Sequence, residues 1–203
     1  MTPAHPDPAL AESYRILRSR IDLSAQPPLT RAVTERIIHA TADFDYVTDL
    51  VCDEPALAAG LSALRRSAPV VADGPTVASG ITGYPVICKA GDPLAARLAR
   101  TANITASAAE VRLAFSAAGP GAVWLAGGGP AALWEIMARE VEPALVIGVP
   151  VGFVGAAEAK DALRRSGLPS LSNVSEKGGP TVAVAAFEAL LRMAQDHEEE
   201  TRA

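Results

Sequence analysis

The sequence predicts an α/β protein: a doubly wound parallel sheet of about five strands, with helices on both faces and a helical lead-in at the N-terminus. Three observations support this class. Short apolar runs bounded by Gly, Pro or Asp recur from residue 69 onward, as buried strands do. Helical stretches separate these runs, and such alternation implies right-handed crossovers between parallel strands. Residues 9–66 precede them with helical spacing and no convincing strand.

Each expected element follows from its local sequence. The expected strands are 69–73 (PVVAD), 85–89 (PVICK), 122–126 (AVWLA), 144–149 (ALVIGV) and, from a weaker apolar pattern, 170–174 (SLSNV). The expected helices that follow are 93–117, 130–142, 156–166 and 180–195. The first of these has Asp92 as its N-cap and Pro93 at its first position. The polar ends, residues 1–8 and 196–203, are expected to be disordered, and residues 1–203 are expected to form a single domain.

Composition and charge exclude several classes of protein. With 203 residues, 49% of them hydrophobic, the chain is long enough for one domain that buries about 70% of its unfolded surface. A formal net charge of −5 argues against nucleic acid as a partner. The chain has no apolar run of about 18 residues and no signal-peptide pattern, so we expect a cytoplasmic protein without a membrane span. Cys52 and Cys88 fit no CxxC pattern, which argues against a disulfide framework or a zinc site.

Glycine-rich turns follow most of the expected strands. Ligands of doubly wound sheets bind beyond the carboxyl ends of the strands, so these turns are the candidate site. Glycines occur at 74, 127–129, 152, 155 and 178–179. A single glycine usually supplies a tight turn, but several such turns on one rim can present backbone N–H groups to anionic parts of a ligand. The spacing matches neither GxGxxG nor GxxxxGK[ST], which argues against a dinucleotide or a nucleoside triphosphate.

One histidine is expected to be held in an ordered helix. His39 lies within the apolar helical stretch RIIHATADFD, whereas His5 and His197 lie in the polar chain ends. Glu35 and Asp43 stand four residues before and after it. A histidine in this setting is usually a satisfied structural residue or half of a surface ion pair. An imidazole is also well suited to proton transfer near neutral pH, so His39 is a candidate catalytic residue.

The segment GVPVGFVGAAEAKDAL, residues 148–163, resembles the signature of the precorrin-8X methylmutase family, whose members are also called cobalt-precorrin-8 methylmutases. Four further segments resemble the family: SYRILRSRIDL (13–23), RIIHA (36–40), VADGPTVASGIT (71–82) and KGGPTVAVAAFEAL (177–190). The resemblance therefore covers nearly the whole chain. It implies an isomerase of cobalamin biosynthesis that moves a methyl group from carbon eleven to carbon twelve of the tetrapyrrole.

The resemblance also implies the site residues. His39 occupies the position of the family's proposed acid–base residue, and protonating the nitrogen of ring C would draw electron density from the migrating centre. No metal or cofactor is needed for such a step. The candidate substrate-binding residues are Ser13 and Arg18 on the first helix, Asp73 and Thr82 around the first strand–helix turn, and Gly128, Gly152 and Gly155 on the glycine-rich rim. For Arg18 the alternative is a solvated helix charge, and for Asp73 it is capping of the following helix. The family is homodimeric with sites near the subunit interface, which we expect here too.

The chain departs from the family at three places. Ala106 stands where the family usually has an arginine, Gly128 where it usually has an asparagine, and Thr41-Ala42 where Cys-Gly is common. Two functions therefore stay open: an active methylmutase, which His39 favours, and a corrinoid-binding paralogue without catalysis, which Ala106 favours. A third, an α/β domain with an unrelated small-molecule ligand, requires the signature match to be accidental.

Overall fold

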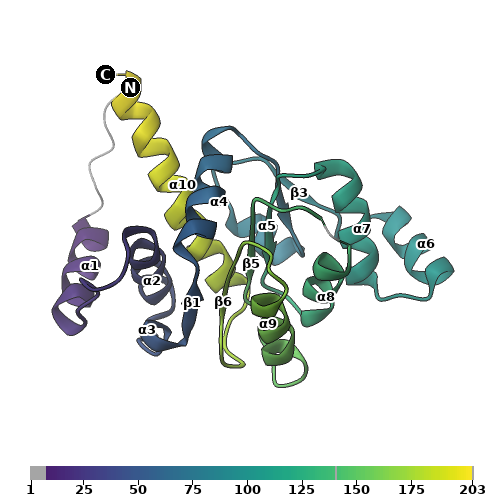
Figure 1. Cartoon of the computed structure of the whole chain (residues 1–203), viewed down its shortest axis with the longest axis horizontal. Helices are drawn as coiled ribbons and strands as arrows, with labels where there is room; N and C mark the ends of the chain where they lie inside the picture. Colours follow the sequence, from purple (N-terminus) through teal and green to yellow (C-terminus); the bar gives the residue numbers. More distant parts are fainter. Residues whose placement is uncertain (1–7, 140, 203) are drawn as a thin grey trace.

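The computed structural model describes residues 8–139 and 141–202, with side chains for 9–139 and 141–196. Its centre is a six-stranded sheet in the order β1-β6-β5-β4-β2-β3 (Figure 1). The strands are β1 (Leu50–Cys52), β2 (Val70–Ala72), β3 (Val86–Cys88), β4 (Val123–Ala126), β5 (Leu145–Gly148) and β6 (Ser170–Asn173). The five expected strands, β2 to β6, pair in parallel, and β1 pairs antiparallel with β6. The predicted α/β class is confirmed.

Helices cover both faces of the sheet, as the doubly wound prediction requires. The helices are α1 (Pro8–Arg20), α2 (Pro28–Thr41), α3 (Tyr46–Asp49), α4 (Glu54–Arg65), α5 (Pro75–Gly80), α6 (Pro93–Ala102), α7 (Ala106–Ala118), α8 (Pro130–Ala138), α9 (Ala156–Arg165) and α10 (Pro180–Arg202). One core lies between the sheet and α1, α2, α4, α5 and α10, and the other between the sheet and α7, α8 and α9. Along β4, Val123 and Leu125 enter the first core, and Trp124 and Ala126 the second, because strand side chains alternate.

Two element predictions are corrected. β1 lies where no strand was expected; three residues carry no readable period, and only pairing with β6 makes them a strand. The helix expected over 93–117 is two helices, because Asn103 adopts a left-handed φ of 51° and Thr105 caps α7 by accepting from the N–H of Ala108. The predicted cap Asp92 is confirmed, since its Oδ1 accepts from the backbone N–H of Leu94 at 2.9 Å.

The chain ends and the membrane prediction can be compared with the structure in part. Most of the expected N-terminal disorder, residues 1–7, lies outside the described residues, as does residue 203. Helix α10 continues to Arg202, whereas disorder was expected from residue 196. Among the described residues, none of the helices combines the length and the apolar character that crossing a membrane requires.

Candidate functional site

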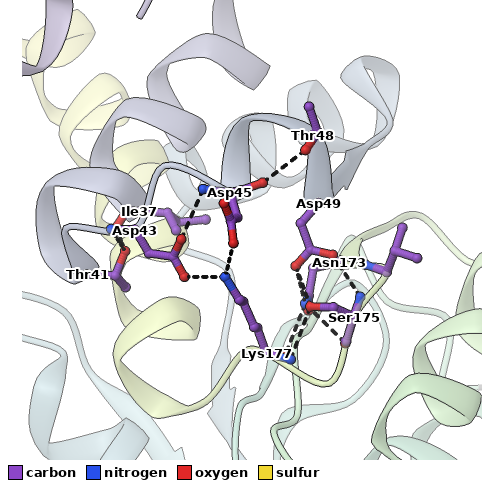
Figure 2. Close-up of polar contacts among 10 residues, drawn as sticks. Ile37, Thr41, Asp43, Asp45, Thr48, Asp49, Asn173, Ser175 and Lys177 are labelled. Atoms are coloured by element: carbon purple, nitrogen blue, oxygen red, sulfur yellow. Dashed lines mark hydrogen bonds and ion pairs between the residues drawn. The ribbon is translucent and has the colours of Figure 1, made fainter. Parts of the chain in front are cut away.

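The C-terminal end of α2, which carries His39, lies at the carboxyl edge of the sheet. Because β1 is antiparallel to β6, the segment that joins α2 to β1 meets the residues that follow β6. Lys177 Nζ donates to Asp43 Oδ2 at 2.7 Å and to Asp45 Oδ2 at 2.5 Å, and Figure 2 shows its side chain extended between the two carboxylates. This contact joins the histidine helix to the glycine-rich edge on which ligands of such folds bind.

The His39 imidazole is held by helix α1. Its Nδ1 lies 2.8 Å from Ser13 Oγ, and its ring stacks on Tyr14 with the centroids 5.0 Å apart and the planes at 11°. A hydroxyl can donate to a neutral imidazole nitrogen or accept from a protonated one, so Ser13 can satisfy Nδ1 in both states. Nε2 is then the nitrogen available for proton exchange with a ligand.

Charged neighbours favour the neutral form of the imidazole in the free protein. Burial lowers the pKa of His39, and the positive charges of Arg36 and Arg192 lower it further. The two carboxylates at helical spacing are engaged elsewhere. Glu35 accepts two hydrogen bonds from Arg18, at 2.9 and 2.7 Å, and Asp43 accepts from Lys177. The alternative of an ion pair between His39 and one of these carboxylates is therefore wrong: the contact to Nδ1 comes from Ser13.

Two of the grooves beside the histidine helix share Arg36. The first has a volume of about 440 Å³, lies between α1, α2 and α10, and is lined by residues that include Tyr14, Arg18, Arg36 and Arg192. The second, of about 280 Å³, lies between α2, α5 and α10, with Arg36, Ala40, Thr76 and Pro180 in its lining. Sequence reasoning selected Arg18 but missed Arg36 and Arg192. Arg36 stands in the RIIHA motif, whereas Arg192 carried no sequence signal.

Asp73 and Gly128 are brought together, as predicted, at the carboxyl ends of β2 and β4. Asp73 Oδ2 accepts from the backbone N–H of Gly128 at 2.8 Å. Burial raises the pKa of Asp73, against the lowering effect of the backbone N–H groups of Gly128 and Gly127. The helix that follows is capped by Gly74 without a side-chain bond, so the capping alternative for Asp73 is wrong. Asp73 instead joins two turns of the rim.

The rim loops after β5 and β6 are bonded to each other through their backbones. The N–H of Gly152 donates to the carbonyl of Glu176 at 3.1 Å, and the N–H of Gly179 donates to the carbonyl of Val149 at 2.7 Å. Gly152 has a φ of 143°, which favours glycine. A Cβ on Gly155, at the start of α9, would lie 3.5 Å from a side-chain atom of Pro130 at the start of α8. The predicted Gly152 and Gly155 therefore lie on the same rim as Gly128.

A buried lysine shapes the loop after β6. Lys160 is fully buried on α9, and its Nζ donates to Asn173 Oδ1 at 2.9 Å, to the carbonyl of Lys177 at 2.7 Å and to the carbonyl of Ser175. Asn173 and Ser175 in turn donate to Asp49, at 2.9 and 2.8 Å (Figure 2). Burial lowers the pKa of Lys160 to about 8. The sequence placed Lys160 in the signature segment without assigning it a role.

The loop between β5 and α9 exposes apolar side chains. Phe153 is 94% exposed and Val154 is 88% exposed, and Val151 is half-exposed on the same loop. Exposed apolar groups that lie together usually mark a surface that contacts a ligand or another protein. The sequence analysis singled out the glycines of this segment and missed these side chains.

Thr82 and Ala106, which the sequence singled out, lie apart from His39 and the glycine-rich rim. Thr82 is exposed in the loop after α5, two residues before Tyr84, whose hydroxyl donates to the carbonyl of Ala68 just before β2. The structure thus places Thr82 toward the opposite end of β2 from Asp73. Ala106 is exposed at the start of α7, which packs on the other face of the sheet from α2.

Comparisons with known proteins identify the relatives of this chain. The family model for precorrin-8X methylmutase matches residues 9–193. The chain is 37% identical over 183 residues to the cobalt-precorrin-8 methylmutase of Salmonella typhimurium, with 87% of each chain covered. It is 34% identical over 192 residues to the precorrin-8X methylmutase of Sinorhizobium sp, with 89% of this chain and 91% of the other covered. The structure is similar to that of precorrin-8X methylmutase from Thermus thermophilus, with a TM-score of 0.84, 34% identity and coverage of 93% and 96% of the two chains.

Proposed function

This chain belongs to the precorrin-8X methylmutase family, and we propose that His39 is the acid–base residue with which it moves the methyl group of its tetrapyrrole substrate. The family makes the chain an intramolecular isomerase of cobalamin biosynthesis. The substrate is precorrin-8X or its cobalt form, the methyl group moves from carbon eleven to carbon twelve, and the product is hydrogenobyrinate or cobyrinate.

The observation that carries the proposal is the contact of His39 Nδ1 with Ser13 Oγ at 2.8 Å. With Nδ1 engaged, Nε2 of the imidazolium donates a proton to the nitrogen of ring C. Electron density then shifts away from the migrating centre and the methyl group moves. His39 Nε2 then recovers the proton from the nitrogen of ring C. The step is an isomerisation, so atoms and protons balance without an added reactant. The stacked Tyr14 ring limits rotation of the imidazole during this cycle.

The proposed substrate lies across the carboxyl edge of the sheet. Asp73, Gly128, Gly152 and Gly155 surround this edge, and backbone N–H groups there can meet peripheral carboxylates. Arg18 stands at the mouth of the first groove with its side chain 64% exposed, which suits contact with a carboxylate once its pairing with Glu35 is exchanged. Ser13 acts through His39 in this proposal. The role of Thr82 rests on the family resemblance alone.

We also propose that the chain is one domain over residues 1–203 that works as a cytoplasmic homodimer, with nucleic acid not among its partners. The family resemblance supports the homodimer, and the exposed apolar side chains of Phe153 and Val154 suit a surface that a second subunit covers. The match of the family model to residues 9–193 supports one domain.

Absorption spectroscopy tests the proposed reaction directly, because methyl migration changes the conjugation of the ring. Protein in excess over precorrin-8X should convert the spectrum of the substrate into that of hydrogenobyrinate in a single turnover. The His39→Ala variant should bind the ring and leave its spectrum unconverted. Tight binding by the natural protein without conversion would instead support a corrinoid-binding protein that lacks catalysis.

A further inference from the structure

The groove between α1, α2 and α10 holds one arginine that is free to bind an anion. Arg18 and Arg36, which line this groove, are each paired with a glutamate. Arg192 lines it too, its side chain is exposed, and among the described residues it has no ion-pair partner. The groove therefore offers an unpaired guanidinium on a chain whose net charge is −5.

Tyr14 connects the groove to the proposed acid–base residue. Tyr14 lines the groove and stacks on the His39 ring, with the centroids 5.0 Å apart. Because Arg36 and Arg192 are positively charged, both also lower the pKa of His39. A ligand group in this groove, whose volume is about 440 Å³, would therefore contact Tyr14, the residue that stacks on the imidazole.

We propose that this groove is a carboxylate subsite, in which Arg192 binds one peripheral acetate or propionate of the tetrapyrrole and holds the ring against His39. The inference rests on the proposed function, because it takes the ring as the ligand. A guanidinium binds a carboxylate through two parallel hydrogen bonds, so one such contact fixes orientation as well as position. The subsite also gives the ring a cationic partner in a chain that has Ala106 where its family usually has an arginine.

Carboxylate binding at this subsite also controls protonation of His39. The other charged groups around the histidine are already paired: Arg18 with Glu35, Arg36 with Glu188, and Lys177 with Asp43 and Asp45. A bound carboxylate offsets the positive charge of the arginines, so the pKa of His39 rises when the ring arrives. The imidazole therefore holds its proton less readily in the free enzyme and more readily in the complex, where the acid is needed.

Binding to two forms of the ring tests the subsite. Hydrogenobyrinate carries peripheral carboxylates, and the same ring with all carboxylates converted to amides does not. Absorption titrations should show that Arg192→Gln weakens binding of hydrogenobyrinate about tenfold to a hundredfold and leaves binding of the amide form unchanged. Arg192→Lys should keep part of the affinity. Arg97→Gln, which removes an equal charge from exposed α6, is the matched control and should bind both rings as the natural protein does.

The outcomes separate the subsite from the proposed function. If the natural protein binds neither ring, the proposed function fails. If it binds hydrogenobyrinate and Arg192→Gln binds it equally well, only the subsite is wrong. An NMR titration of His39, one of three histidines, supplies a readout that a purely structural role would not change. Its pKa should rise on addition of hydrogenobyrinate and stay unchanged with the amide form; equal pKa values in both complexes would overturn the coupling.

Discussion

At the scale of single residues, the proposed chemistry depends on which nitrogen of His39 is engaged. Ser13 takes Nδ1, and the Tyr14 ring covers one face of the imidazole. Both contacts come from α1, so the lead-in helix orients the imidazole of the proposed acid–base residue. The neighbouring carboxylates, Glu35 and Asp43, pair with Arg18 and Lys177 and serve to hold helices and loops together.

Replacing His39 should separate catalysis from binding. We expect His39→Ala to lower the single-turnover rate about 10²- to 10⁴-fold, because general acid–base catalysis contributes that much. Its affinity for hydrogenobyrinate should change little, and its circular dichroism should match that of the natural protein. Ser13→Ala, which removes the Nδ1 partner and keeps the imidazole, should lower the rate by about tenfold or less. Natural turnover by a folded His39→Ala protein would exclude the histidine from the mechanism.

The residue after the histidine helix is a point of local strain. Ala42 caps α2 with a left-handed φ of 54°. This conformation is unfavourable by about 1 kcal/mol or more for a residue with a Cβ, and glycine relieves it. Ala42→Gly should therefore raise the free energy of unfolding by about 1 kcal/mol in urea titrations. Ala32→Gly within the same helix is the control and should lower it by about 0.5–1 kcal/mol. A lower stability of Ala42→Gly would contradict this account.

At the scale of elements, the site depends on how two rim loops are held. The loop after β6 is bonded to the loop after β5, to the segment between α2 and β1, and to the buried ammonium of Lys160. A Cβ at Gly178 would overlap the carbonyl oxygen of Val149, so the two loops approach as closely as backbone allows. The Lys160 side chain on α9 thus holds the loop after β6 in place.

The buried lysine should make stability depend on pH in a predictable direction. Its pKa is about 8 in the folded protein against an ordinary 10.5, so between these values the unfolded chain binds more protons. The stability contributed by Lys160 therefore rises as the pH rises from 8 to 10.5. Lys160→Met leaves Asn173 Oδ1 without its donor, so it should be less stable at pH 7 by roughly 1–3 kcal/mol, and it lacks the further stability that Lys160 contributes as the pH rises above 8.

Unfolding curves at several pH values measure this effect. The difference in the free energy of unfolding between the natural protein and Lys160→Met should widen by roughly 1–3 kcal/mol from pH 8 to pH 10.5. Lys89→Met, which removes a more exposed lysine, is the matched control for loss of an ammonium group. Parallel stability curves for the natural protein and Lys160→Met would mean that the lysine titrates near its ordinary pKa.

At the scale of the whole molecule, the two faces of the sheet have different tasks. The face with α1, α2 and α10 carries the histidine, the arginines and the two grooves that share Arg36. The other face, with α7, α8 and α9, supplies Lys160 to the rim. The two faces meet at the carboxyl edge, where the apolar loop with Phe153 and Val154 stands exposed.

The exposed apolar loop gives a test of the proposed homodimer. Light scattering should give a molar mass twice that of the 20.9 kDa chain for the natural protein. Phe153→Ser should shift the equilibrium toward the monomer, because it removes a large apolar group that a second subunit would cover. Leu94→Ser, a similar change at a 61% exposed position on α6, should leave the mass unchanged. A dimer that is equally stable with Phe153→Ser would place the interface elsewhere.

The sequence by itself determined the elements whose signals are local. The five parallel strands, the Asp92 cap and the glycine-rich turns follow from apolar runs, capping residues and turn residues that lie within a few positions of one another. The family could be identified from the linear signature at 148–163. His39 could be selected because it lies in an apolar helical segment and in the RIIHA segment that resembles the family.

Only the tertiary structure decided which side chains meet. β1 is a strand because it pairs with β6. Lys160, Arg36 and Arg192 lie at the site because they contact residues that are far from them in the sequence. Likewise, Ser13 contacts the His39 imidazole although the two residues are 26 positions apart. The carboxylates at helical spacing from His39, Glu35 and Asp43, pair with other residues. Periodicity reports which face of an element is buried, but contacts between elements depend on how the elements pack, and that packing is set by the whole core.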